Sequence, residues 1–404
     1  MRRRRTGLPA LAVTALLIAA CSGGADGDAD SSTAPETSTT LDAPSSTLEP
    51  AADTVATTTN PTFDDGPLDE VCGDTIVVQT SSFPDVGAGP LYALLGPAPV
   101  VDTERQATSA PLTRADGTVE AVTLEIRSGG PAVGFRSPVA VMADDDSIHL
   151  AVASTAVSVS DRPLLETRAL MTFTDRSRDA LIIDPATFPD VASIADVGDQ
   201  GIEVRHVTDA PVIAFLAADG VIDTEQLVPG SDGLPASFVG AQGAVAQQGD
   251  LTIEPVLLPA LEQWGRPVTA LPAADAGWAS LDDLLLADSA TERIADECLG
   301  RFVRVLQQSV AAYVANPTAT NVVMSEARSR FNPLARLTPA LLDAGMQIAR
   351  DAGVFDTART DAPGTIPTDG LSTFLDDLAS ALGVEPVTVD ELVDLRFLDR
   401  TISR

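Results

Sequence analysis

The sequence of 404 residues contains no lysine, so all 25 of its basic side chains are arginine. Without lysine, the chain has neither a phosphate-binding Gly-Lys-Ser/Thr loop nor an amine for Schiff-base chemistry. Acidic residues number 58, which gives a formal net charge of −33. Nucleic-acid binding depends on a basic surface, so we predict no nucleic-acid partner. We interpret the negative charge as a solvated surface that keeps the protein soluble.

Groups that carry catalysis or bind metals are also scarce. The two histidines, His149 and His206, each lie inside an expected strand, and we interpret both as structural. The sequence has no Gly-x-Ser-x-Gly motif and no His/Cys cluster with metal-ligand spacing. The run 144–146 of three aspartates is a candidate calcium site, but such a run is more often an exposed turn. We therefore predict that the protein is not an enzyme and has no cofactor or metal.

The N-terminus has the pattern of a lipoprotein signal peptide. Arginines occupy positions 2–5, and an apolar run over residues 8–20 is too short to span a bilayer. The small residues before Cys21 resemble a bacterial lipobox, in which the cysteine is diacylated and becomes the new N-terminus. We predict a signal peptide over residues 1–20 and lipidation of Cys21, the alternative being an ordinary secretory signal.

Residues 21–70 are predicted to form a disordered tether. They are rich in Ser, Thr, Pro and Asp, and such a composition cannot bury enough apolar surface to offset the entropy of ordering. No later apolar run approaches the roughly 18 residues of a transmembrane helix. The lipid is then the only predicted membrane attachment, and the predicted location is the extracellular face of the cell membrane.

Two cysteines, Cys72 and Cys298, remain for the folded region. In an oxidising compartment an even pair predicts a disulfide, with two separate buried thiols as the alternative. We expect the bridge to join the start of the domain to a C-terminal helix.

Strand-like and helix-like segments alternate in the first part of the folded region, which indicates a parallel α/β sheet. Expected strands cover 75–79, 122–126, 148–153, 181–185, 202–207 and 244–248, and the expected helices cover 91–95, 138–143, a segment from Asp209 capped by Thr208, 294–310, 338–353 and 371–382. The last three helices are expected to pack back on the first unit. We predict two lobes, with lobe 1 made of residues 71–178 and 268–404 and lobe 2 of residues 179–267.

Three loops that follow successive expected strands are rich in hydroxyl groups or glycine. They are 80–84, 128–131 and 154–155. In open α/β sheets, ligands lie beyond the carboxyl ends of the strands, where backbone N–H groups and helix N-termini point into the crevice. The three loops together therefore predict one ligand cleft.

The segments 74–92, 124–131, 181–185, 245–249 and 253–255 resemble the substrate-binding proteins of importers for thiamine-pyrimidine precursors, nitrate, sulfonates and taurine. The resemblance covers about residues 72–313 and implies a two-lobe type II periplasmic-binding fold. Carried onto this sequence, it implies ligand-binding roles for Ser82, Phe83, Asp85, Gly129, Gly130, Ser154, Thr155, Gln247, Gln248 and Glu254. Members for aromatic pyrimidines have a tryptophan and more acids in the first loop, so a pyrimidine ligand is not indicated.

These features predict a monomeric, lipid-anchored protein that captures a small polar solute for the permease subunits of an ABC importer. The alternative is a sensor or surface lipoprotein that keeps the fold without transport. An enzyme of the same fold that uses a lysine-bound cofactor is excluded, because the chain has no lysine.

Overall fold

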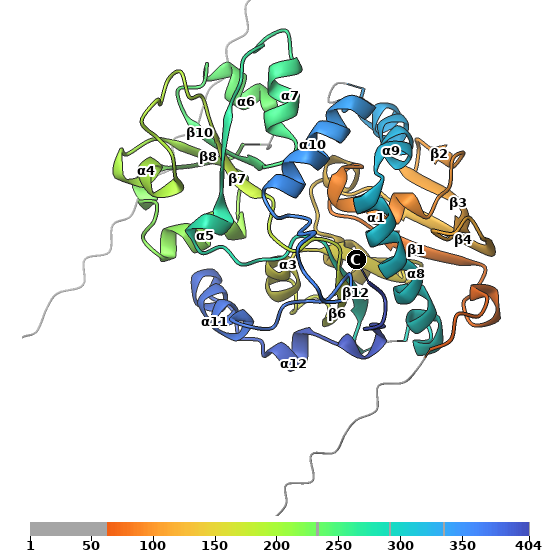
Figure 1. Cartoon of the computed structure of the whole chain (residues 1–404). Helices are drawn as coiled ribbons and strands as arrows, with labels where there is room; N and C mark the ends of the chain where they lie inside the picture. The colour runs from red at the N-terminus through yellow and green to blue at the C-terminus, as the bar shows by residue number, and fades with distance from the viewer. Residues whose placement is uncertain (1–62, 232–233, 291, 334–335, 404) are drawn as a thin grey trace, which may run out of the picture. The chain divides into compact units, whose positions relative to one another are not determined.

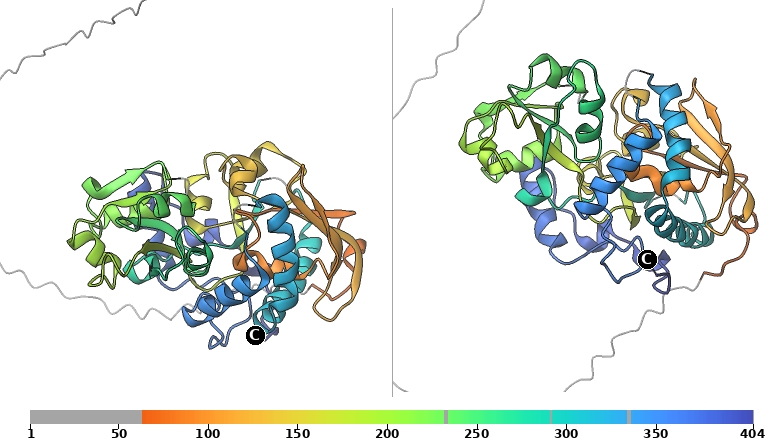
Figure 2. Two further views of the ribbon diagram at one scale, coloured as in Figure 1. Left: turned by 90° about the horizontal axis from the view of Figure 1, so that it is seen from above. Right: turned by 45° about the horizontal axis from the view of Figure 1, so that its top comes forward.

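The computed structural model describes residues 63–231, 234–290, 292–333 and 336–403. The predicted signal peptide, Cys21 and most of the tether lie outside the described residues. Two mixed β-sheets with helices on their faces organise the described part (Figures 1 and 2), which confirms the predicted α/β class.

The larger sheet has seven strands in the order β2-β3-β4-β1-β5-β12-β6. Its strands are β1 (Thr75–Gln79), β2 (Val100–Asp102), β3 (Ala107–Thr113), β4 (Val119–Arg127), β5 (Leu150–Ala153), β6 (Thr167–Thr172) and β12 (Leu284–Asp288). The central strands β1 and β5 are buried almost throughout, as expected for strands covered on both faces.

The smaller sheet has five strands in the order β11-β7-β10-β8-β9. They are β7 (Asp179–Ile183), β8 (Val204–His206), β9 (Leu227–Pro229), β10 (Ala246–Asp250) and β11 (Thr269–Pro272). The chain therefore crosses between the sheets twice, after β6 and again between β11 and β12. Because β11 belongs to this sheet, the sheet extends past residue 267, where we placed the end of the second lobe.

The strands predicted for the first part of the folded region, β1, β4 and β5, are parallel as expected, but both sheets are mixed because further strands join them antiparallel. Strand β1 pairs in parallel with β4 and β5, but β12 lies antiparallel between β5 and β6, and β3 pairs antiparallel with β4. In the smaller sheet β10 and β11 both run antiparallel to β7. Antiparallel neighbours need no helical crossover, so β2, β3 and β12 enter the larger sheet without the βα alternation on which the prediction relied.

Twelve α-helices are present in the described part of the chain. They are α1 (Gly89–Ala93), α2 (Pro138–Asp144), α3 (Thr155–Ser160), α4 (Ile194–Asp199), α5 (Pro211–Ala218), α6 (Pro235–Gly240), α7 (Glu254–Ala260), α8 (Asp296–Ala315), α9 (Thr318–Phe331), α10 (Pro339–Asp351), α11 (Leu371–Leu382) and α12 (Val389–Leu392). None of these described helices is both long and apolar enough to cross a membrane.

The predicted capping of α5 by Thr208 is wrong. The helix begins at Pro211, and its N-cap Ala210 makes no side-chain hydrogen bond. Asp209 has a φ of 58°, in the left-handed region, so the chain turns there before the helix starts. Proline at the first helical position fixes the helix start and disfavours helical geometry in the residue before it.

The C-terminal helices contact helices of both lobes, not only those of the first lobe. Helix α8 packs on α1, as expected, but α10 also packs on α7, and α11 packs on α5 (Figure 1). An aromatic cluster joins the second pair: Phe374 of α11 and Phe215 of α5 both contact Trp278, with ring centroids 5.5 and 5.3 Å from the indole. The rings of Phe215 and Phe374 also lie 5.6 Å from each other, so the two lobes share a buried apolar contact beyond the crossing segments.

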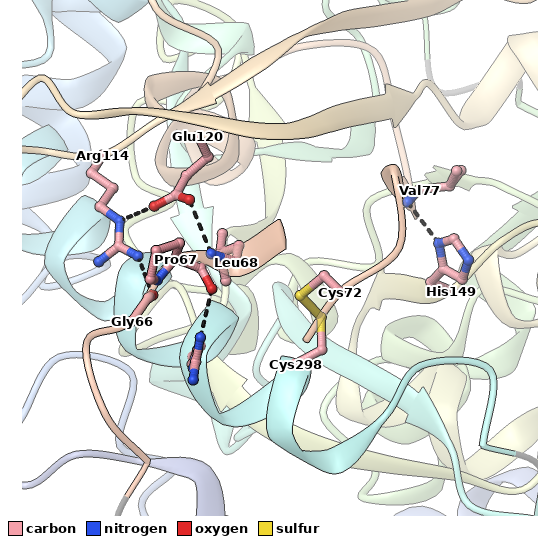
Figure 3. The surroundings of a disulfide bond; sticks show 10 residues. Gly66, Pro67, Leu68, Cys72, Val77, Arg114, Glu120, His149 and Cys298 are labelled. Carbon is pink, nitrogen blue, oxygen red and sulfur yellow. Dashed lines mark hydrogen bonds and ion pairs between the residues drawn. A yellow bond between two sulfur atoms is a disulfide. The ribbon is translucent and has the colours of Figure 1, made fainter. Parts of the chain in front are cut away.

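The predicted disulfide between Cys72 and Cys298 is confirmed, with Cα atoms 5.0 Å apart (Figure 3). It ties the segment before β1 to the first turn of α8. Polar contacts secure the same segment, since Leu68 N donates to Glu120 Oε2 at 3.0 Å and Arg301 donates to the Pro67 carbonyl at 2.6 Å. These contacts attach the start of the folded region to strand β4 of the larger sheet and to helix α8.

Both histidines make backbone contacts. The Nδ1 atom of His149 accepts a hydrogen bond from Val77 N at 3.0 Å (Figure 3), just before β5 begins. In β8, Nδ1 of His206 lies 2.8 Å from the carbonyl of Val207. The aspartate run 144–146 is engaged in ion pairs with Arg136, Arg127 and Arg293. The described residues contain no cluster of three His, Cys, Asp or Glu side chains placed to hold a metal.

Candidate functional site

A cavity of about 270 Å³ lies where segments of the two sheets meet. Its lining takes residues from the loops after β1 and β5, from both crossing segments, and from β10 and the start of α5. These residues are Ser81, Ser82, Asp85, Ala153, Ser154, Ala156, Val157, Arg178, Asp179, Pro211, Val212, Gln248, Asp250, Trp278 and Asp282. Four of the predicted ligand-binding residues are among them, namely Ser82, Asp85, Ser154 and Gln248.

The loop after β1 is held by Asp85. Its Oδ1 atom accepts hydrogen bonds from the N–H groups of Gly87 (3.0 Å) and Ala88 (3.4 Å), which caps the short 3₁₀ turn that leads into α1. Its Oδ2 atom accepts from the hydroxyl of Ser82 at 2.7 Å. The loop's polar side chains are therefore pre-positioned at the cavity edge by a local cap.

The loop after β5 is held in a similar way. The hydroxyl of Ser154 caps α3 by accepting from Val157 N at 3.1 Å, and the residue stays at the cavity lining. The next residue, Thr155, is buried, and its hydroxyl accepts from Leu281 N at 3.2 Å. Thr155 thus joins this loop to the second crossing segment and does not line the cavity.

Phe83, Gly129 and Gly130 also lie outside the cavity lining. Phe83 is buried and stacks on Phe331 of α9, with ring centroids 6.3 Å apart. Gly129 donates its N–H to the Ser82 carbonyl at 3.1 Å, and a Cβ at this position would clash with the backbone of Thr80. Gly130, with a φ of 60°, continues the same turn. These three residues therefore contribute to the packing and hydrogen bonding of the loop that carries Ser81 and Ser82, on the side away from the cavity lining.

The three residues predicted from the smaller sheet have different positions. Gln248 lines the cavity and accepts from Val207 N at 3.1 Å through its side-chain oxygen. Gln247 is buried and donates to the Leu234 carbonyl at 3.3 Å, because alternate residues of a strand point to opposite faces. Glu254 is buried at the start of α7 and accepts from Asp250 N at 2.6 Å.

The charged centre of the site was not predicted from the sequence. Arg178, in the first crossing segment, is 6% exposed and forms ion pairs with Asp250 (2.6 Å) and Asp283 (3.2 Å). A third carboxylate, Asp85, lies 3.5 Å from the same guanidinium. The arginine therefore links the first loop, the second crossing segment and strand β10, which come from both sheets.

Acidic residues outnumber basic ones around this arginine, and burial raises their pKa values. Desolvation by burial raises the pKa of Asp179 to about 6 and that of Asp283 to about 6. Burial also raises the pKa of Asp250 and raises that of Asp282 well above its ordinary value. For Glu254, burial and then the charge of Asp250 raise the pKa to about 8. Three of these groups, Asp179, Asp250 and Asp282, line the cavity, and perturbed carboxyl groups at one cavity mark a candidate functional site.

A second cavity, of about 410 Å³, lies on the larger sheet near His149. Two ion pairs lie in its lining, Arg293 with Asp288 and Arg396 with Asp296, each at 3.0 Å. The cavity around Arg178 takes its lining from segments of both sheets, and we therefore assign the candidate site to it.

Neither a scan against protein-family models nor a search of curated proteins finds a match to the sequence. Solved structures do match. The alkanesulfonate-binding protein SsuA of Xanthomonas axonopodis pv. citri, bound to MOPS, has a TM-score of 0.50 at 11% identity, over 79% of this chain and 98% of that one. The periplasmic aliphatic sulphonate binding protein SsuA of Escherichia coli has a TM-score of 0.50 at 11% identity, over 82% and 94%.

The desulfurization enzyme DSZB is also similar, with a TM-score of 0.45 at 12% identity over 80% of this chain and 97% of that one. The similarity to the two SsuA proteins, at 11% identity, shows the fold alone. The chain has the two-lobe fold of the periplasmic substrate-binding proteins.

Proposed function

We propose that this protein is the extracellular solute-binding component of an ABC importer, anchored by a lipid on Cys21, and that it holds a small polar solute between its two lobes. The observation that carries the proposal is the cavity itself. Its lining combines loops of the larger sheet with Gln248 and Asp250 of the smaller sheet, and Arg178 links the two.

A solute bound there would contact both lobes at once. Such contacts are the means by which a ligand shifts a two-lobe protein toward its closed form, because only a contact that differs between two states changes their populations. We propose binding without catalysis, a monomeric state, and permease subunits as the membrane partner.

Native mass spectrometry of the mature protein, after exposure to the small-molecule fraction of a cell extract, tests the binding step. The parent should retain one small molecule. Val157→Trp fills the cavity and should abolish retention, whereas the matched control Val322→Trp, at an exposed site of α9, should retain the molecule as the parent does. A parent that retains nothing, or equal retention by Val157→Trp, contradicts the proposal. A solute-uptake assay then separates an importer component from a sensor.

A further inference from the structure

The cavity carries an excess of negative charge. Its lining contains four carboxyl groups and one guanidinium, an excess of three acidic side chains over basic ones. The carboxylates belong to Asp85, Asp179, Asp250 and Asp282. A cavity with one sign of charge and low-dielectric walls concentrates ligands of the opposite sign.

Arg178 does not neutralise this excess. Its guanidinium already pairs with Asp250, Asp283 and Asp85. Asp179 and Asp282 form no ion pair with any residue in the described ranges. They accept neutral hydrogen bonds instead: Trp278 Nε1 donates to Asp179 at 2.9 Å, and the Ser177 hydroxyl donates to Asp282 at 3.0 Å. Burial and then the charge of Asp179 raise the pKa of Asp282, and the charge of Arg178 offsets this rise only in part.

A second observation concerns a hydrogen-bond donor. The Nε–H of Arg178 is buried and has no hydrogen-bond partner among the described residues, although the side chain lines the cavity. An unmade hydrogen bond on a buried charged group is costly, so an acceptor on a ligand that reaches this donor would be stabilising.

From these two observations we infer that the cavity takes a small ammonium compound that also carries an oxygen acceptor, and not an anion. The inference rests on the proposed binding function and names its ligand class. The ammonium group meets Asp179 and Asp282, and the oxygen accepts from Arg178 Nε. An anion would face the carboxylates of Asp179 and Asp282, which have no ion-pair partner among the described residues.

Isothermal titration at low salt tests the inference with five probes: ethanolamine, choline and glycine betaine against methanesulfonate and nitrate. At least one ammonium compound should bind at least about tenfold more tightly than either anion, since a charge-assisted hydrogen bond contributes about this factor. Tighter binding of an anion, or no binding of any ammonium compound, overturns the inference. If native mass spectrometry still shows a retained solute, only the inference fails; if it shows none, the proposed function fails as well.

Charge-neutralising variants locate the interaction. Asp282→Asn and Asp179→Asn keep the size of the side chain and should each weaken binding of the ammonium probe about tenfold. Glu385→Gln removes one negative charge at an exposed site far along the chain and serves as the control, with unchanged affinity. Both Asn variants should melt as single cooperative units, which shows that they fold. Unchanged affinity in both would contradict the assignment.

Discussion

Replacement of Glu254 by glutamine should make the protein more stable near neutral pH. Glu254 is 6% exposed, and burial followed by the charge of Asp250 raises its pKa from 4.5 to about 8. Between these two pH values the folded protein holds the proton and the unfolded chain releases it. The free energy of unfolding therefore falls as pH rises through this window, because the folded state binds more protons.

The magnitude follows from the width of the window. Inside this window the proton held only by the folded state lowers the free energy of unfolding by about 1.4 kcal/mol for each pH unit. Between pH 5 and pH 7, Glu254 therefore lowers the free energy of unfolding of the parent by about 3 kcal/mol. Glutamine has no proton to hold and removes this pH dependence, while its side-chain oxygen still accepts from Asp250 N. The difference in stability between Glu254→Gln and the parent should grow by about 3 kcal/mol over that range.

Urea unfolding at pH 5 and pH 7, with the disulfide intact, measures this difference. The exposed control Glu385→Gln should differ from the parent by less than about 0.5 kcal/mol at both pH values. A constant difference between Glu254→Gln and the parent across the two pH values would refute the reasoning, since it would mean that Glu254 titrates alike in the folded and unfolded states.

Three further outcomes are expected. Replacing both Cys72 and Cys298 by serine frees a loop closed across 226 residues and should lower the free energy of unfolding by up to about 5 kcal/mol, measured by urea unfolding; no change would mean that the bridge does not constrain the unfolded chain. Gly87→Ala places a Cβ against Arg178 and Asp283 and should cost about 1–3 kcal/mol in the same assay, and an unaffected variant would show that this ion pair moves freely. Cys21→Ala should move the protein from the membrane fraction to the medium, and unchanged fractionation would contradict lipidation.

The sequence predicted the first parts of the site because they follow a general rule of α/β sheets. Ser82 and Ser154 come after β1 and β5, which are adjacent parallel strands, so their loops meet at one edge. The rule could not show which loop residues face the cavity. Phe83 and Thr155 are buried beside residues that line it, a difference decided by the local caps of Asp85 and Ser154.

The charged centre could not be found by the same rule. Arg178 and Asp282 lie in the two crossing segments, outside every helix and strand, so no helical or strand pattern could indicate them. The available signal was the concentration of charge at those crossings, in the pairs Arg178–Asp179 and Asp282–Asp283. Strand β12 was missed for a different reason: its run of leucines fits a buried helix as well as a strand.

A crystal structure of the protein with its retained solute tests the central claim most directly. We predict one small molecule in the cavity between Ser82 and Gln248, with a nitrogen within about 3 Å of a carboxylate oxygen of Asp179 or Asp282. An oxygen of the same molecule should accept from Arg178 Nε. A solute bound elsewhere, or one whose anionic group faces these aspartates, would contradict the account.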